Sequence, residues 1–363
     1  MPKQAKSEMK TAGVSIVKNE CDIIEVFVRR NWLLLDFLLV IDNISEDSTM
    51  EILALLCNEQ PSRLKAISAF YLNHQQEQMM TSIIHSLAVD GDYDIIFPLD
   101  ADEILRAPSR ESLEKQLLEL PLGTIGALEW KTYVPTSDQN VNEVDPTTRI
   151  YKRRKNELTT VHKVVIPSYM AATPGFRLER GNHNASIDNE PLNAVVLEEC
   201  WLAHFPVRSS EQIASKALLG EWALRGKATR ADNEGNHWQR LARQLVIDSH
   251  PTSSQLEQIG RDYGRVDNGS AVLELISDPL PSNPEFNIQY PEKTSIDLLA
   301  RIVHFSDMLT SRLALTPFES EEMRISKTSY GWLAHHITDT VIGRSIALYG
   351  EWAAEELELL IQL

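Results

Sequence analysis

Three acidic side chains follow the apolar stretch IIFPL at residues 95–99. They are Asp100, Asp102 and Glu103, and only Ala101 separates the first two. If the chain is still extended there, Asp100 and Asp102 project to the same side. Two such carboxylates can hold Mg2+ or Mn2+, which prefer oxygen ligands and commonly bridge protein carboxylates to a diphosphate. The spacing is therefore compatible with a metal–diphosphate site at the end of a buried strand.

Other interpretations of this acidic stretch remain open. Acidic residues are common wherever a strand exits to solvent, so a solvated strand end or a helix N-cap also explains it. Asp100 could also be the nucleophile of a phosphotransfer reaction. An EF-hand loop is excluded because Leu105 stands where a glycine is needed. The sequence contains neither GxGxxG nor GxxxxGK[ST], which excludes a dinucleotide fingerprint and a P-loop.

The sequence around the acids predicts an α/β fold. Over the first hundred residues, β-leaning stretches alternate with helical patterns, which is typical of βαβ units and a parallel sheet. We expect strands at 13–17, 36–42, 64–71 and 92–100, with helices at 22–34, 50–60 and 75–89. Further on we expect a helix at 111–120, strands at 125–135, 149–154 and 162–168, and helices at 209–226 and 237–249. This pattern predicts a Rossmann-like mixed sheet flanked by helices, with a mainly helical C-terminal region.

Composition narrows the class of protein. The 363 residues are 43% hydrophobic, enough for a sizeable core. The net charge of -17 argues against nucleic acid as a partner. No apolar stretch approaches the roughly 20 residues of a membrane span, so we expect a soluble, cytoplasmic protein. Cys21, Cys57 and Cys200 lie far apart without CxxC spacing, which argues against disulfides and a zinc knuckle.

Polar residues also follow the first two expected strands. In an open α/β sheet the ligand crevice lies beyond the carboxyl ends of the strands. Lys18, Asn19 and Glu20 follow the first strand, and Asp42 and Asn43 end the second. These side chains should therefore gather at the same edge of the sheet as the acidic stretch.

The order of three motifs carries a family resemblance. VSIVKNE (14–20), LVIDNISEDST (39–49) and FPLDADEIL (97–105) together resemble glycosyltransferase family 2, a group of GT-A fold enzymes, in its branch with VKNE and LDADE motifs. HKVVIPS, GNHN and LAHFPVRSSEQIASK are similar to that branch as well, so the resemblance spans about residues 12–220. It implies a GT-A domain at 11–215, a helical and irregular extension at 216–325 and a helical tail at 326–363.

The resemblance assigns roles to individual residues. The nucleotide-sugar would be bound by Val17, Asn19, Glu20, Asp42, Gln78 and Asp100. Asp42 would accept a hydrogen bond from a ring N–H of the base. Asp102 would be the principal ligand of Mn2+ or Mg2+, and Glu103 would support it or face the acceptor. The usual DGS turn is Asn43-Ile44-Ser45 here, without the glycine, so the backbone should take a different path.

Histidine and basic residues complete the implied site. GT-A enzymes often recruit a histidine as a further metal ligand. We expect His204 in this role, with His183 as the substitute, although either could be a structural hydrogen-bonding residue. Weaker candidates are His74, His85 and His162. Three basic side chains could neutralise phosphate or lie on a solvated surface: Lys163, Arg208 and Lys216.

The implied activity is that of a metal-dependent inverting glycosyltransferase. A sugar would pass from a UDP- or GDP-sugar to a hydroxyl of a glycan or glycolipid, as in polysaccharide biosynthesis, and the acceptor could bring the enzyme to a membrane surface. A carboxylate would accept the proton of the attacking hydroxyl, with Glu129 and Asp145 as candidates. The metal would offset charge on the leaving diphosphate. The alternative is a noncatalytic GT-A-like module that binds a nucleotide or serves as a scaffold.

The end of the chain carries a second resemblance. Residues 338–363 are similar to the segment that precedes the methyltransferase domain in FkbM-type proteins. This similarity implies a fused or partner methyltransferase. The alternative is an amphipathic helix that packs on a neighbouring element or forms a dimer contact.

Overall fold

The computed structural model describes residues 9–69, 76–90, 92–158, 161–225, 251–265, 273–281, 287–292, 323–328 and 331–336. The chain divides into two compact units, residues 1–299 and residues 300–363. In the second unit the described residues form an antiparallel pair, β14 (Met323–Thr328) and β15 (Gly331–His336). The expectation of a helical tail over 326–363 is therefore wrong for these strand residues. The helix predicted at 237–249 and the final segment 338–363 lie outside the described residues.

The first unit contains the predicted α/β sheet. Its first four strands run parallel, in the spatial order β3, β2, β1, β4. They are β1 (Thr11–Val17), β2 (Phe37–Asp42), β3 (Leu64–Ser68) and β4 (Ile95–Pro98). The helices between them are α1 (Ile24–Asn31), α2 (Thr49–Glu59) and α3 (Gln76–Asp90). The predicted βα alternation is confirmed, because each short apolar stretch is long enough for one buried strand.

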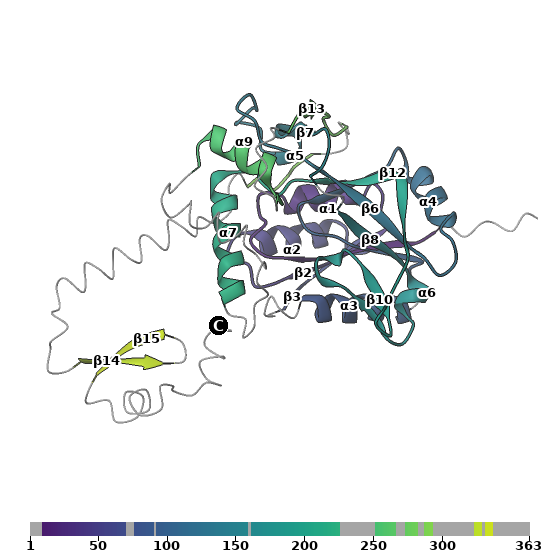
Figure 1. Cartoon of the computed structure of the whole chain (residues 1–363), viewed down its shortest axis with the longest axis horizontal. Helices are drawn as coiled ribbons and strands as arrows, with labels where there is room; N and C mark the ends of the chain where they lie inside the picture. Colours follow the sequence, from purple (N-terminus) through teal and green to yellow (C-terminus); the bar gives the residue numbers. More distant parts are fainter. Residues whose placement is uncertain are drawn as a thin grey trace, which may run out of the picture. The chain divides into compact units, whose positions relative to one another are not determined.

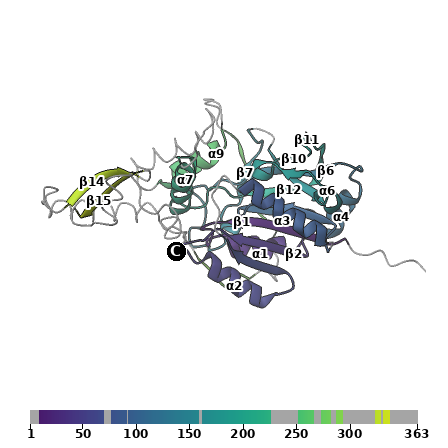
Figure 2. The same ribbon diagram turned by 90° about the horizontal axis from the view of Figure 1, so that it is seen from below.

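Four further strands extend the sheet beyond β4 and make it mixed. The full order is β3-β2-β1-β4-β8-β6-β12-β5, with β8 antiparallel to both β4 and β6. The added strands are β5 (Glu103–Arg106), β6 (Ile125–Thr132), β8 (His162–Pro167) and β12 (Ala194–His204). Figure 1 and Figure 2 show this curled sheet with helices on its faces. The predicted fold class, an α/β mixed sheet flanked by helices, is confirmed.

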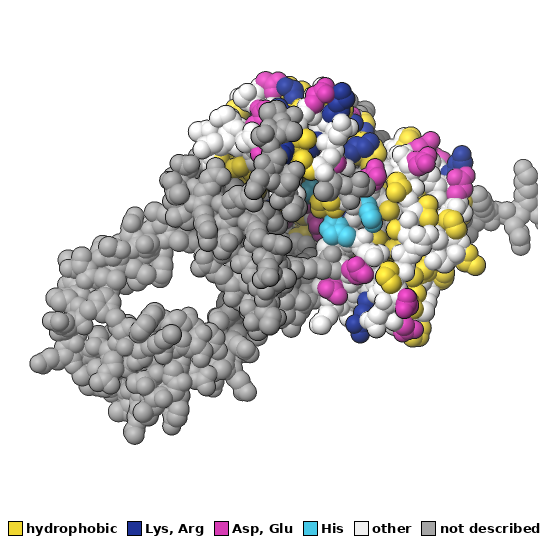
Figure 3. Space-filling model, in the orientation of Figure 1, with side chains coloured by type: hydrophobic (Ala, Val, Ile, Leu, Met, Phe, Trp, Pro, Cys, Tyr) yellow, Lys and Arg dark blue, Asp and Glu magenta, His cyan; other side chains and the backbone are white. Residues whose placement is uncertain are grey.

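Short elements fill the connections between these strands. They are α4 (Arg110–Leu118), α5 (Pro146–Arg149), α6 (Ser168–Ala171), the 3-10 turn η2 (Arg180–Asn182), β7 (Lys152–Arg154), β9 (Phe176–Leu178), β10 (Ala185–Ile187) and β11 (Glu190–Pro191). After β12 come α7 (Ser210–Arg225), α9 (Ser253–Asp262) and β13 (Leu275–Ser277). In the region of α9, β7 and β13, acidic and basic side chains are intermixed on the face shown in Figure 3. Pairs such as Lys155 with Glu274 and Arg153 with Asp278 account for this mixture.

Two hydrophobic clusters flank the sheet and hold it rigid. One contains Phe27 of α1 and Leu53 of α2, and the other contains Ile84 of α3 and Met170 of α6. Strand alternation supplies both clusters, because neighbouring residues of a strand point to opposite faces. No helix in the part of the chain that the structure describes has the length and apolarity needed to cross a bilayer.

Candidate active site

The three acids lie on a turn that carries the chain from one part of the sheet to another. β4 ends at Pro98 in the parallel half, whereas β5 begins at Glu103 and pairs with β12 at the sheet edge. The backbone N–H of Asp100 donates to Glu103 Oε2 at 2.9 Å, and the N–H of Glu103 donates to the Asp100 carbonyl at 3.0 Å. The Phe205 N–H donates to the Asp102 carbonyl at 2.8 Å. The acids are therefore fixed in a crossing turn bound to the end of β12.

Lys163, which lies on β8, forms ion pairs with two of these acids. Its Nζ lies 2.6 Å from Asp100 Oδ2 and 3.5 Å from Glu103 Oε1, and its side chain is only 1% exposed. Burial alone would lower the pKa of Lys163, but Asp100 and Glu103 raise it above its usual range. The ammonium group therefore stays charged. Lys163 is thus a site residue rather than a solvated surface lysine.

Asp102 binds a second lysine and faces a histidine. Lys216 of α7 lies with Nζ 2.5 Å from Asp102 Oδ2, and His204 Nε2 lies 3.8 Å from the same oxygen. Burial alone would raise the pKa of Asp102, but Lys216, His204 and Arg208 outweigh it and hold the pKa below its usual range. Asp102 is therefore an ionised carboxylate at neutral pH.

His204 is a neutral imidazole packed against an aromatic ring. It ends β12 opposite Glu103 of β5 and stacks on Trp130, with 4.2 Å between ring centroids. Burial lowers the pKa of His204 to about 3, although Asp102 opposes this shift. Within the described part of the chain, its buried Nδ1 has no hydrogen-bond partner. A neutral imidazole can donate an electron pair to a metal ion.

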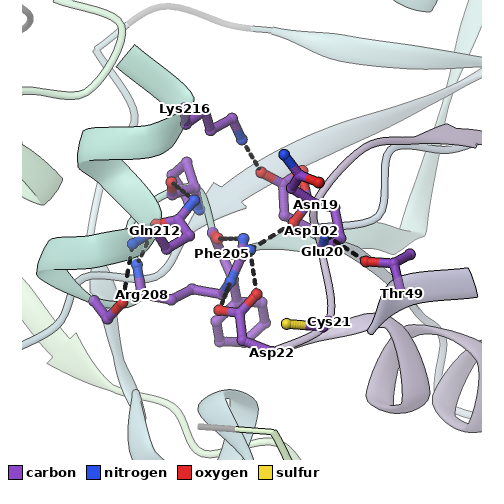
Figure 4. A network of polar contacts seen from close by, with 12 residues as sticks. Asn19, Glu20, Cys21, Asp22, Thr49, Asp102, Phe205, Arg208, Gln212 and Lys216 are labelled. Carbon is purple, nitrogen blue, oxygen red and sulfur yellow. Dashed lines mark hydrogen bonds and ion pairs between the residues drawn. The ribbon is translucent and has the colours of Figure 1, made fainter. Parts of the chain in front are cut away.

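Arg208, next to the start of α7, joins this helix to the end of β1. Its guanidinium donates to both oxygens of Asp22, at 2.7 and 2.8 Å, and to Glu20 Oε2 at 2.5 Å. Figure 4 shows the two acids around the guanidinium, with Lys216 and Asp102 beside them. Glu20 is thus held in an ion-pair network at the edge of the implied nucleotide pocket. Its backbone N–H donates to Thr49 Oγ1, which ties the strand end to α2.

The ends of β1 and β2 form the other part of the site. Val17 is buried at the end of β1, and its carbonyl accepts the Asn43 N–H. Asn19 Oδ1 accepts the Glu46 N–H at 2.8 Å, and Asp42 Oδ2 accepts the Ser45 N–H at 3.0 Å. Two polar atoms are left over. Among the described residues, the buried Asp42 Oδ1 and Asn19 Nδ2 have no hydrogen-bond partner.

The missing glycine of the DGS turn leaves a strained residue in its place. Ile44 adopts φ 48°, in the left-handed region, and Lys18 Nζ donates to its carbonyl at 2.8 Å. A β-branched residue rarely adopts this conformation, which costs on the order of 1–3 kcal/mol.

Replacing Ile44 by glycine is therefore expected to raise the free energy of unfolding by about 1 kcal/mol, since glycine adopts this φ without steric cost. Urea denaturation measures the change. Leu55→Gly, which alters an exposed apolar residue inside α2, is the control and should lower stability by about 1 kcal/mol. A loss of stability in Ile44→Gly would contradict the assignment of strain to this turn.

Glu103 should make stability depend on pH. Burial raises its pKa from 4.5 to about 8, although Lys163 opposes this shift. Between these values the unfolded chain releases the proton that the folded chain keeps. The free energy of unfolding should therefore fall as pH rises from about 5 to 8, by up to about 1.4 kcal/mol per pH unit. The amide introduced by Glu103→Gln cannot titrate, so urea denaturation of the variant and of the wild type between about pH 5 and 8 isolates the contribution of Glu103. If the free energy of unfolding depended on pH in the same way in both proteins, the prediction would be disproved.

Several predicted site residues lie away from the acidic turn. Asp145 caps α5, accepting the Thr147 N–H at 2.7 Å, and pairs with Arg30 at 3.1 Å. Glu129 neighbours Trp130 on β6, and alternation directs it to the opposite face from the Trp130 ring. Neither arrangement places a catalytic base beside Asp102.

Of the remaining candidates, His183 lies beside the site, in contact with Trp130, whereas Gln78 and His85 lie on α3. Gln78 is exposed on α3, and His85 Nδ1 lies 2.9 Å from the Ala171 carbonyl. His183 contacts Trp130 edge-on, and its Nδ1 lies 2.7 Å from the carbonyl of His162, the first residue of β8. His74 lies outside the described residues.

Two residues of the site, Trp130 and Asp22, are not among those predicted from the sequence. Trp130 donates from Nε1 to Glu103 Oε1 at 2.7 Å and stacks on His204, which joins β5, β6 and β12. Asp22 pairs with Arg208, which lies 186 positions later in the chain. The position of Asp22 two residues after the VKNE motif was the available signal, whereas nothing local distinguished Trp130 from a core aromatic residue.

The side chains around Asp102 fit a divalent cation that is bound together with a phosphate ligand. Asp102 and His204 offer one oxygen and one nitrogen, and among the described residues no group of three His, Cys, Asp or Glu side chains could hold a metal alone. Mg2+ is commonly held by one or two carboxylates and completed by substrate phosphates and water. Five acidic side chains lie against three basic groups here, Glu20, Asp22, Asp100, Asp102 and Glu103 against Lys163, Arg208 and Lys216. Burial raises the pKa of Glu20 to about 7 and that of Glu103 to about 8, so the fit rests on Asp102 and His204 and not on an excess of negative charge.

Comparisons with known proteins give weak likenesses to solved structures. No protein-family model and no curated protein sequence matches the chain. The mannosyltransferase PcManGT from Pyrobaculum calidifontis, in complex with GDP-Man and Mn2+, is 16% identical over 37% of each chain, with a TM-score of 0.25. S. aureus TarS 1-349 in complex with UDP is 13% identical over 66% of this chain and 71% of that chain, with a TM-score of 0.34. Glucosyl-3-phosphoglycerate synthase from Mycobacterium tuberculosis is 17% identical over 36% of this chain and 49% of that chain, with a TM-score of 0.22.

Proposed function

We propose that the chain is a glycosyltransferase of the GT-A type, which transfers a sugar from a UDP- or GDP-sugar to a hydroxyl of a glycan or glycolipid. The observation that carries the proposal is the pair of unsatisfied atoms at the ends of β1 and β2. Among the described residues, Asp42 Oδ1 and Asn19 Nδ2 are buried without hydrogen-bond partners. Buried polar atoms are costly unless they are paired, so an unpaired acceptor and donor indicate a ligand.

The chemistry of these two atoms selects a class of nucleobase. Uracil and guanine each carry a ring N–H beside a carbonyl oxygen, which a carboxylate acceptor and an amide donor can match. Neutral cytosine and adenine lack this ring N–H next to a carbonyl. The pair Asp42 and Asn19 therefore favours uridine or guanosine diphosphate over the cytidine and adenosine nucleotides.

The acidic turn would receive the diphosphate and the sugar. Asp102 with His204 would hold Mn2+ or Mg2+, which supplies electrostatic stabilisation of the leaving diphosphate. Lys163 fixes the side chains of Asp100 and Glu103, so the turn keeps its shape. The acceptor hydroxyl would attack the anomeric carbon from the side opposite the diphosphate, with inversion, and lose its proton to a base. The acceptor class and a partner methyltransferase follow from sequence resemblance.

A nucleotide panel tests the proposal, with thermal shift as the readout and UDP, GDP, CDP and ADP as ligands in the presence of Mn2+. UDP or GDP should raise the melting temperature, since a ligand that binds only the folded state stabilises it. Asp42→Asn converts the acceptor into an amide and should weaken the preferred nucleotide about tenfold or more. Asp138→Asn, which alters an exposed carboxylate paired with Lys152, is the control and should change nothing.

The outcomes separate the two hypotheses about function. Release of UDP or GDP from a sugar nucleotide on addition of an acceptor would establish transfer. Nucleotide binding without transfer, for every sugar nucleotide tried, would favour the noncatalytic binding module. A folded wild-type chain that none of the four nucleotides stabilises would rule out the proposal.

A further inference from the structure

Two lysines bind the acidic turn, and the structure holds them in different ways. Lys163 extends from a strand, is 1% exposed and lies between Asp100 and Glu103. Lys216 extends from the second turn of α7, is 26% exposed and reaches Asp102 Oδ2 at 2.5 Å. Packing thus fixes Lys163, whereas the Lys216 side chain is partly exposed and carries its ammonium group at the end of a flexible four-carbon chain. Lys216 is the cation that can leave the turn.

Lys216 occupies the oxygen that a metal ion would need. Asp102 Oδ2 is the carboxylate atom that faces His204 Nε2 at 3.8 Å, and the same atom binds the Lys216 ammonium. Two cations close to one oxygen repel each other strongly where water is largely excluded. Binding of a divalent cation to Asp102 and His204 therefore competes with the ion pair to Lys216.

The backbone of α7 is held in place while this side chain exchanges. Arg208, just before the helix, is fully buried and pairs with Asp22 and Glu20. Ile213 in the first turn packs in a cluster with Leu256 of α9. A moving Lys216 therefore stays within reach of the turn.

We propose that Lys216 is a tethered cation that occupies Asp102 in the empty site and passes to the donor diphosphate when a divalent cation displaces it. This inference rests on the proposed function. Its consequence is coupling: the metal releases an ammonium group for the diphosphate, and the diphosphate stabilises the displaced lysine. Metal and nucleotide should therefore each increase the affinity of the other, as linkage requires.

Isothermal titration calorimetry of the full chain tests the exchange. We would measure the affinity for Mn2+ without nucleotide, and then the affinity for UDP and GDP with saturating Mn2+. Lys216→Met removes the competitor, so it should bind Mn2+ alone about tenfold more tightly and bind the nucleotide about tenfold more weakly. Lys216→Arg keeps the charge and should stay closer to the wild type in its Mn2+ affinity.

Lys152→Met is the matched control. It also removes a lysine that lies 2.6 Å from a carboxylate, that of Asp138, but outside the site. Its affinities should equal those of the wild type. Circular dichroism would verify folding of each variant. If Lys216→Met does not fold, Mn2+ titrations of the wild type with and without UDP or GDP still measure the coupling directly.

Each outcome has a defined meaning. Unchanged or weaker Mn2+ binding in a folded Lys216→Met, or independent binding of metal and nucleotide in the wild type, would overturn the role of Lys216. In both cases the wild type would still bind the nucleotide, so the proposed function would stand. A folded wild type that binds neither Mn2+ nor any nucleotide would overturn both.

Discussion

Asp102→Asn is expected to reduce kcat/KM for sugar transfer by at least about 10²–10³-fold, because it removes the only negative charge placed between His204 and Lys216 in the described site. The amide keeps the size of the side chain. The bond from the Phe205 N–H to the backbone carbonyl of residue 102 also remains. The loss should therefore reflect chemistry and ligand binding rather than unfolding.

Steady-state release of the nucleoside diphosphate measures this effect, with thermal denaturation as the check on folding. The variant should also lose the stabilisation by nucleotide that depends on Mn2+. Asp138→Asn serves as the control because its exposed carboxylate lies outside the turn. Transfer at the wild-type rate in Asp102→Asn would exclude Asp102 from the catalytic site and would favour a different function for the acidic turn.

Arg208→Met is expected to lower the free energy of unfolding by about 3–5 kcal/mol. The guanidinium is fully buried between Asp22 and Glu20, so its removal leaves two carboxylates without their cation. The pKa of Arg208 lies above its usual range, because the two acids outweigh the effect of burial, so the guanidinium is charged at neutral pH. Removing one partner of a buried pair costs much more than removing an exposed one.

Chemical denaturation measures the loss, and Lys155→Met provides the comparison. Lys155 and Glu274 form an ion pair with side chains 50% and 66% exposed, so that variant should change stability by less than about 1 kcal/mol. Similar small losses in both variants would show that the Arg208 network contributes little net stability. The Arg208 variant should also lower nucleotide affinity, since Arg208 joins α7 to the end of β1.

Local sequence patterns were sufficient to predict the strands of the parallel half of the sheet and the polar residues at their ends. Short apolar stretches such as 13–17 and 36–42 became β1 and β2, because strand formation depends on a local pattern of period two and burial. Polar residues that end or directly follow such strands, among them Asp42, must then lie at one edge. This is why the position of the candidate site could be predicted before its contacts were known.

Local patterns failed where a residue has a distant partner. Residues 103–106, which begin with the third acid, carry no clear strand signal, yet they form β5 because β12 offers an open edge for pairing. Asp145 resembled a free carboxylate in sequence, but it caps α5 and pairs with Arg30, which is 115 positions away. Neither residue type nor spacing reveals which of several chemically suitable groups will be the partner.

The sequence by itself therefore determined the strands of the parallel half, the acidic stretch after the fourth strand and the polar residues at the strand ends, since each depends on neighbours along the chain. Only the tertiary structure decided how these acids are neutralised. Lys216 reaches Asp102 across 114 positions, and Lys163 reaches Asp100 across 63. The physical reason is that an ion pair requires only proximity in space. The tertiary fold brings Lys163 of β8 and Lys216 of α7 close to the acids, whatever their separation along the chain.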